Sequence, residues 1–495
     1  GRAAESARWR RNVYRFDQFS AEHAELPQFL VGFHAVASEQ DMRDYISRIG
    51  GIARALGQLR ERAEVAAKEG VRAPRFAYDT VIEQSRAVIS GQPFDDSAAS
   101  APLWQDVQHK VGALVAAGTI SPGTAENLRQ QARSALLEEV RPAYRSLIAW
   151  LERDRVNTSA EARGASSLPD GKAYYAHRLR SYTTTDMSAA KIHQLGLMEV
   201  ARIQGEMRAI KEEVGFEGDL AEFFDFVRSD PQFYYPDTDA GRQAYLEETR
   251  HYLAQIKAHL PDYFGILPRS PLEVRRVETF RELDGGSAFY ETGTADGSRP
   301  GVYYSHLSDM SANSRVDLQT TAYHEGTPGH HMQGSIALER SDLPLFRTNV
   351  WYSAYGEGWA LYAELLAWEM GMYDQPYYNF GRLGAEIFRA IRLVVDTGLH
   401  AMNWSEEQAV QYMLDNSAIP ESFVRSEIRR YLVYPGQATS YKVGMIKILE
   451  LRERARVRLG DAFDIRAYHD LVLGGGALPL DILERRVDGW IAAGR

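Results

Sequence analysis

The chain has 495 residues, 44% hydrophobic and 25% charged, which is enough for one large globular core or for two to three domains. The formal net charge of -10 and the lack of a basic block argue against nucleic acid as a partner. The absence of cysteine excludes disulfides, thiolate metal ligands and a cysteine nucleophile, and no apolar run reaches the roughly 20 residues of a transmembrane segment.

Helical periodicity dominates the first part of the chain. A capping-box-like start at Ser38 precedes apolar residues spaced mostly three and four apart, and Gly70 ends this segment. A second helical pattern covers residues 124–153, with a kink expected at Pro142. A third covers residues 187–213.

A loop is expected at residues 157–173, which are rich in Ser, Ala and Gly. We therefore divide the chain into an N-terminal helical region, residues 1–165, and a catalytic region, residues 166–495, which carries the candidate site residues. The alternative is one continuous domain with two lobes.

Strand signals are few, and all of them lie upstream of a His-Glu pair at residues 324–325. Weak alternation marks residues 274–280 and 287–292, and residues 301–306 are the clearest strand candidate. Helical patterns resume near Ser314 and continue to the end. The predicted fold class is therefore mainly α, with a small β-sheet next to the helix that carries the His-Glu pair.

Residues 323–333 read Tyr-His-Glu-Gly-Thr-Pro-Gly-His-His-Met-Gln and begin like the zinc-protease signature H-E-x-x-H. In that signature the second histidine follows four residues after the first, so both imidazoles share one helix face and reach one zinc ion. Pro328 stands at that position here. The stretch is therefore either a variant metal motif or a pair of unrelated histidines.

The spacing of His324 and His330 decides between these two interpretations. In a straight helix they would lie about 9 Å apart along the axis and about 120° out of phase. Pro328 removes a backbone donor, and Gly326 and Gly329 permit unusual backbone angles. The segment therefore predicts a broken helix, and a bulge of two residues would return His330 to the position of the second ligand.

A third ligand is predicted on the helix at residues 355–370. This helix is apolar almost all round, and its only charges are three glutamates without a Lys or Arg among them. Buried carboxylates are costly unless they meet a cation or donors. Glu357 and Glu364 share one face, so a metal would explain both, with Glu357 as ligand and Glu364 orienting a histidine. The alternative is that they pair with distant arginines.

These motifs resemble the bacterial "domain of unknown function 885" family. The resemblance covers nearly the whole chain and is carried by residues 323–333, 356–364, 168–175, 192–197, 392–400 and 434–437. That family is similar to gluzincin zinc metallopeptidases with helical, cleft-shaped folds, such as angiotensin-converting enzyme, thimet oligopeptidase and Taq-type carboxypeptidase.

The resemblance implies one Zn2+ held by His324, His330 and Glu357. The two-residue insert keeps His331 as the alternative ligand, and otherwise His331 is expected to line the cleft as a second donor to substrate. A late tyrosine donates to the oxyanion in the similar peptidases. The local pattern favours Tyr441, with Tyr434 as a further substrate-contact candidate, and core packing is the alternative for either tyrosine.

A further polar cluster comprises Arg389, Arg392, Asp396 and His400, which fall within an arc of about 80° on a helix. Periodicity alone favours a solvated face. The alternative is a cleft in which the arginines bind a peptide carboxylate through bidentate hydrogen bonds.

The combined prediction is a zinc metallopeptidase acting on short peptides, with metal-activated water and Glu325 as general base. The strand at residues 302–306 is expected to hold substrate backbone by strand addition. The alternatives are a metal-dependent amidase on a non-peptide amide and an inert helical binding protein. The chain begins without Met, so we expect a removed upstream segment; a signal sequence there would imply export, and the cytoplasm is the alternative.

Overall fold

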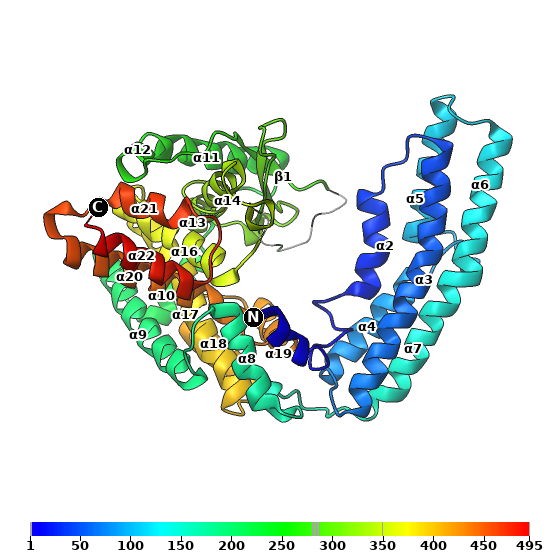
Figure 1. Ribbon diagram of the computed structural model, residues 1–495, viewed down its shortest axis with the longest axis horizontal. Helices are drawn as coiled ribbons and strands as arrows, with labels where there is room; N and C mark the ends of the chain where they lie inside the picture. Colours follow the sequence, from blue (N-terminus) through cyan, green and yellow to red (C-terminus); the bar gives the residue numbers. More distant parts are fainter. Residues whose placement is uncertain (1, 280–281, 283–285, 287, 349, 495) are drawn as a thin grey trace. The chain divides into compact units, whose positions relative to one another are not determined.

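The computed structural model describes residues 2–279, 282, 286, 288–348 and 350–494 (Figure 1). The described residues form a mainly helical protein with one three-stranded sheet. The chain divides into two compact units. The first comprises Gly1–Tyr174, Asn403–Glu406 and Leu432–Tyr434, and the second comprises Tyr175–Met402, Glu407–Tyr431 and Pro435–Arg495.

The first unit is a bundle of antiparallel helices, and α8 continues into the second unit. The helices are α1 Arg2–Arg8, α2 Glu22–Phe33, α3 Glu39–Lys68, α4 Arg75–Val88, α5 Pro102–Ala116, α6 Pro122–Ala135, α7 Arg141–Arg155 and α8 Gly171–Thr183. The Ser38 hydroxyl caps α3 by accepting a hydrogen bond from the Asp41 N–H, as its sequence position predicts. From Met42 to Leu56 every third or fourth residue of α3 is buried, so this helix packs with one apolar face.

The distortion expected near Pro142 takes the form of a π-helical turn, η1 Leu136–Val140, between α6 and α7. Within it the Arg141 N–H bonds the carbonyl of Leu136, five residues back. Pro142 has no N–H with which to continue the ladder, so the change of hydrogen-bond pattern just before it has a local cause.

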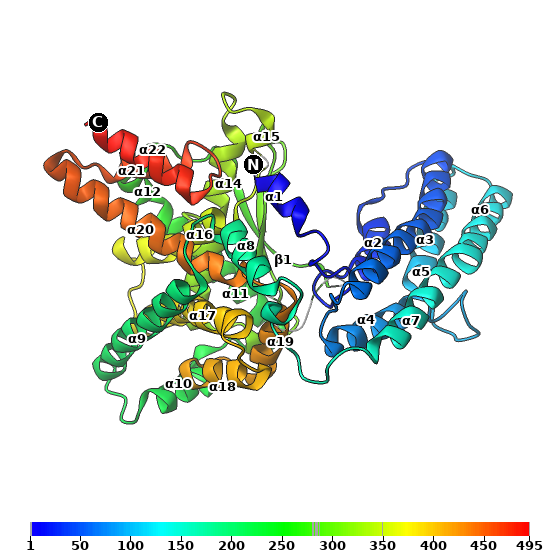
Figure 2. The same ribbon diagram turned by 60° about the horizontal axis from the view of Figure 1, so that its bottom comes forward.

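The second unit holds the remaining helices and the sheet. The helices are α9 Ala189–Glu213, α10 Leu220–Ser229, α11 Asp239–Lys257, α12 Leu260–Tyr263, α13 Arg315–Glu325, α14 His330–Glu339, α15 Leu345–Thr348, α16 Ser353–Glu369, α17 Pro376–Ala401, α18 Glu406–Asn416, α19 Glu421–Val433, α20 Ser440–Leu459, α21 Ile465–Leu473 and α22 Leu480–Ala492. The helix α9 lies alongside α17 (Figure 1 and Figure 2), and α16 packs against α20. Within the described residues, each helix is too short or too polar to span a membrane.

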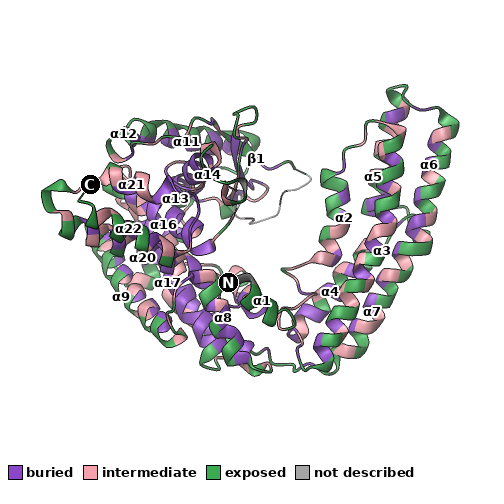
Figure 3. Cartoon of the chain, viewed as in Figure 1, coloured by how far each residue is buried: buried purple, intermediate pink, exposed green. Residues whose placement is uncertain are grey.

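The helices α13, α16 and α17 form the interior of the second unit and are buried along most of their length (Figure 3). The helices α16 and α20 come together at two glycines. A Cβ added at Gly358 would lie 2.5 Å from the Gly444 backbone, and one added at Gly444 would lie 1.9 Å from the Ala354 carbonyl oxygen. This close approach requires glycine on both helices, and it determines where the first turn of α20 lies relative to α16.

The sheet contains the three strands predicted from the sequence, β1 Leu272–Arg276, β2 Phe289–Glu291 and β3 Gly301–Ser305. The predicted ends at Phe280 and Ser287 lie outside the described residues. The strand order is β1-β3-β2, with β3 parallel to β1 and antiparallel to β2. The prediction that β3 accepts substrate by strand addition is wrong, because both of its edges are already paired and all five residues are buried.

Candidate metal centre

The helix that carries the His-Glu pair is broken, which confirms the prediction from Pro328. The helix α13 ends at Glu325, and α14 begins at His330. The indole N–H of Trp359 donates to the Pro328 carbonyl over 2.8 Å and so fixes the intervening turn against α16. A Cβ added at Gly329 would lie 2.0 Å from the carbonyl oxygen of His324, so only glycine fits there.

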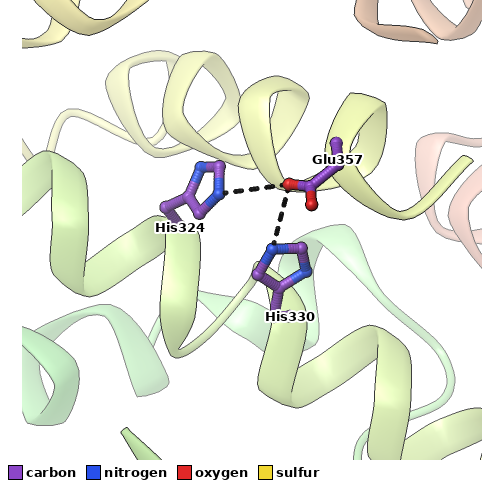
Figure 4. Close-up of side chains that lie close together, drawn as sticks. All are labelled: His324, His330 and Glu357. Carbon is purple, nitrogen blue, oxygen red and sulfur yellow. Dashed lines mark ion pairs between the residues drawn. The ribbon is translucent and has the colours of Figure 1, made fainter. Parts of the chain in front are cut away.

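This break brings His330 next to His324, and both face Glu357 on α16 (Figure 4). The Oε2 atom of Glu357 lies 3.4 Å from His330 Nε2 and 3.8 Å from His324 Nε2, and the imidazole centroids are 4.8 Å apart. Ligand atoms around a tetrahedral ion at about 2.0–2.1 Å are separated by roughly 3.4 Å. Among the described residues these three alone form such a cluster of His and carboxylate donors, with all donor atoms within 4.8 Å.

The carboxylate of Glu364 orients the first histidine. Its Oε1 atom accepts a hydrogen bond of 2.7 Å from His324 Nδ1, and the side chain is 2% exposed. Because a carboxylate only accepts, Nδ1 carries the hydrogen and Nε2 offers its lone pair toward Glu357 and His330. The third glutamate of α16, Glu369, instead forms an ion pair with Arg452 on α20. Its charge is therefore explained by a distant arginine.

The electrostatics of the cluster favour a cation. Burial alone would raise the pKa of Glu357, but hydrogen bonds and charges from His324 and His330 hold it well below its usual range. Burial alone would lower the pKa of His324, but hydrogen bonds with Glu357 and Glu364 raise it to about 9. The same negative field that holds a proton on His324 would favour a divalent ion between the three side chains.

Glu325 follows the first histidine and points into a cavity of about 820 Å³ in the second unit. Burial raises the pKa of its carboxyl, while the charges of His324 and His330 act in the opposite direction. The wall of this cavity contains Tyr290, Thr292, Arg299, His324, Glu325, His330, Gln333, Val350, Trp351, Glu357, Phe388, Arg389, Arg392, Phe423, Glu427 and Tyr441, among others. A carboxylate beside the three donors, on the same wall, can take up or deliver a proton there.

Tyr441 also lies in this wall, on the first turn of α20. The glycine contact between α16 and α20 places that turn near Glu357, whose charge adds to burial in raising the pKa of the Tyr441 hydroxyl. The Arg392 guanidinium lies 4.9 Å from the Tyr441 ring centroid. The structure thus places Tyr441 in the same cavity wall as the three donors, where the resemblance to the peptidases and the local pattern predict it.

His331 is not brought to the three donors, nor does it line the cavity. Its Nδ1 atom lies 3.1 Å from the Tyr290 hydroxyl and 3.4 Å from Ser335 Oγ, and burial lowers its pKa to about 4. Successive residues of a helix point about 100° apart, so the start of α14 can direct only one of the two histidines at Glu357.

The cluster on α17 is not a solvated face, which corrects the interpretation favoured by periodicity. Arg392, Asp396 and His400 are buried, and Arg389 is half-buried. The helices α9, α13, α16 and α20 all pack against α17, so most of its polar face meets protein rather than bulk water. Only Arg389 and Arg392 line the cavity.

The other two residues of the cluster support neighbouring segments. Asp396 accepts hydrogen bonds from the Tyr175 hydroxyl over 2.5 Å and from the Gly436 N–H over 3.1 Å. His400 Nε2 donates to the Tyr431 carbonyl over 3.0 Å. Tyr434 belongs to the first unit, where its ring packs 4.9 Å from that of Phe19.

Trp351 lines the cavity and was not predicted from the sequence. Its ring lies 5.9 Å from that of His330 and rests on Gly356, where an added Cβ would lie 2.2 Å from the indole. A glycine inside a buried helix could have indicated such a contact.

Replacing Gly329 by alanine is expected to destabilise the protein by about 1–3 kcal/mol or more, because the new Cβ overlaps the His324 carbonyl. Gly334→Ala, inside the helix that Gly329 precedes, is the matched control, since its nearest new contact is an ordinary 3.4 Å. Thermal unfolding of both variants checks this prediction. Equal midpoints for the two variants would mean that the break does not depend on glycine.

Known proteins match this chain over nearly its whole length. A family model described as "Bacterial protein of unknown function (DUF885)" matches residues 2–487. The crystal structure of a "putative lipoprotein" from Colwellia psychrerythraea is 34% identical with a TM-score of 0.89, over 97% of this chain and 81% of that chain. A second structure, a "putative lipoprotein of unknown function" from Shewanella oneidensis, is 18% identical with a TM-score of 0.68, over 94% of this chain and 83% of that chain.

No curated protein matches the chain. The family model covers nearly every residue, and the Colwellia psychrerythraea structure matches at 34% identity along almost the whole length. The chain therefore belongs to the bacterial domain of unknown function 885 family.

Proposed function

We propose that the protein is a zinc-dependent metallopeptidase that hydrolyses peptide bonds in short peptides. The observation that carries the proposal is the convergence of His324, His330 and Glu357, with all donor atoms within 4.8 Å, beside Glu325 on one cavity wall. Two imidazoles and one carboxylate form a donor set typical of catalytic zinc, which leaves a coordination position for water or substrate. We propose further that the protein resembles the gluzincin peptidases, including their helical, cleft-shaped fold.

His324, His330 and Glu357 would hold the zinc ion, which when bound would supply Lewis acidity toward the scissile carbonyl and make water more acidic. Glu364 holds His324 in the tautomer that offers Nε2, over the 2.7 Å hydrogen bond to Nδ1. The Glu325 carboxylate accepts a proton from the attacking water and delivers it to the leaving amine. The Tyr441 hydroxyl donates to the carbonyl oxygen as negative charge develops there.

The dimensions of the cavity support short substrates. About 820 Å³ falls within the range of sites for small ligands, and the wall combines aromatic rings with a few charged groups. A short peptide fits such a site, because its backbone needs polar partners and its side chains need apolar ones. A folded protein substrate would need a more extended surface of contact.

Metal analysis tests the proposal directly. The purified protein is expected to hold one zinc ion per chain, and removal with a chelator should abolish peptide hydrolysis, which added zinc should restore. The reason is that the three donors come together from α13, α14 and α16, and the proposed reaction depends on a metal held by them to make water more acidic. A protein that holds no metal after growth with zinc, and folds normally, would instead be an inert helical binding protein.

A further inference from the structure

Two arginines of α17, three residues apart, line the cavity. One of them forms an ion pair with a carboxylate of the protein, and the other does not. The charge of Arg392 is compensated inside the protein. Its Nη2 atom lies 2.9 Å from Glu427 Oε2, and its Nε donates to the Tyr431 hydroxyl over 2.9 Å. The guanidinium also lies 4.1 Å from the Phe388 ring centroid, which fixes its orientation.

The charge of Arg389 has no such partner. Its Nη1 atom donates to the carbonyl of Ala385 over 3.3 Å, and its Nε is buried without a hydrogen-bond partner. Among the described residues no carboxylate forms an ion pair with it. The charges of Asp317 and Glu325 act on it only from a longer range. A half-buried guanidinium without a directly bonded carboxylate is costly, and an anionic ligand in the cavity would lower that cost.

The position of Arg389 indicates where such an anion would lie. Its Cζ atom is 5.8 Å from the ring centroid of Tyr441, the residue proposed to contact the scissile carbonyl. The two side chains are therefore neighbours in the cavity wall, and one residue of extended chain, which spans at most about 3.3–3.6 Å, can separate an anion at Arg389 from a carbonyl at Tyr441. An anion at Arg389 would therefore belong to the residue next to the bond that is cleaved.

We propose that Arg389 binds a substrate carboxylate beside the cleaved bond, and that this carboxylate is the C-terminus of a short peptide. The protein would then release the last residue of its substrates, as a carboxypeptidase does. Every unmodified peptide carries a terminal carboxylate, whereas an Asp or Glu side chain supplies the same chemistry only in some sequences. The inference rests on the proposed peptidase function and names its substrate class.

The test compares acetylated tripeptides ending in Ala, Phe, Lys or Asp, each as the free acid and as the C-terminal amide. The zinc-loaded protein is expected to cleave the free acids with a kcat/KM roughly 10- to 100-fold above that of the amides, the usual effect of a charged hydrogen bond. Arg389→Gln should abolish this preference by lowering kcat/KM on the free acids to the value for the amides, mainly through a higher KM. Arg389→Lys, which keeps the charge but loses the planar fork, should restore part of it.

Arg425→Gln is the matched control, because Arg425 is an arginine of the same unit that pairs with Glu407 and Glu421 at the surface. It should keep the full preference for free acids. Equal cleavage of acids and amides by the unmodified protein, or an equal loss on both in Arg389→Gln, would overturn the proposal. A preference for amides that end in Asp over free acids that end in Ala would also overturn it, by assigning the carboxylate to a side chain.

Binding measurements separate this inference from the proposed function. If no peptide is cleaved, calorimetry of the same acid and amide pairs decides whether the carboxylate site exists. Tighter binding of the acids, lost in Arg389→Gln, would support the carboxylate site while the peptidase proposal fails. Equal binding of acid and amide would overturn the carboxylate site as well.

Discussion

Replacing Glu325 by glutamine is expected to lower peptide turnover by roughly 10²- to 10⁴-fold while leaving the zinc content at one ion per chain. Glutamine keeps the size and hydrogen-bonding capacity of the side chain but cannot accept a proton. Glu325 lies beside the three donors without belonging to their cluster, so its charge is not needed to hold the ion. The checks are single-turnover kinetics and metal analysis of the same preparation.

The matched variant for this experiment is Glu357→Gln, on the opposite helix. Glu357 is the one carboxylate of the donor cluster, so its loss should lower zinc occupancy and activity together. Added zinc should recover part of the activity of Glu357→Gln and none of that of Glu325→Gln. Equal loss of zinc in both variants, or full activity in Glu325→Gln, would show that the two roles are wrongly assigned.

His330→Ala is expected to lose the bound zinc, and His331→Ala is expected to keep it. His330 Nε2 lies 3.4 Å from Glu357 Oε2, whereas His331 Nδ1 is directed at the Tyr290 hydroxyl, 3.1 Å away. Removing one of three protein ligands should lower zinc affinity by several orders of magnitude, because two donors remain. The measurement is the zinc content of both variants after dialysis against the same buffer.

The two histidine variants should also differ in stability. His331 is buried against strand β2 and Ser335, so His331→Ala should cost about 1–3 kcal/mol from lost packing and the lost contact with the Tyr290 hydroxyl. His330→Ala should change the stability of the zinc-free protein less, since His330 faces the cavity. Zinc lost only in His331→Ala would assign the second ligand to His331 and contradict the geometry of the break.

Local features of this protein follow from the sequence. Ser38 and Ser314 cap helices where hydroxyls can reach backbone N–H groups, and the three strands lie where alternation indicated them. The break between α13 and α14 follows from Pro328 and two glycines, because a missing N–H and absent Cβ atoms act within a few residues. The position of Glu357 and Glu364 on the same face of α16 follows from helical periodicity alone.

Other features depend on elements far apart in the sequence, and periodicity could not predict them. The cluster on α17 has the polar pattern of a solvated face, but packing buries it, so Arg389 and Arg392 meet the cavity while Asp396 supports a distant turn. The strand β3 has an ordinary strand pattern, and only sheet order shows that both of its edges are occupied. Whether an arginine has a partner is likewise a tertiary property.

The sequence by itself therefore determined the helices, the strands, the break at Pro328 and a short set of candidate metal donors, since each depends on chemistry within one or two turns. The tertiary structure decided which histidine meets Glu357, since a helix start can direct only one of two neighbouring side chains across to α16. It also decided that Tyr441 joins this site, because the glycine contact between α16 and α20 joins segments that are distant in the chain. Two helices pack closely only where the surface of one fits the surface of the other. The sequence of a single helix describes only one of these two surfaces.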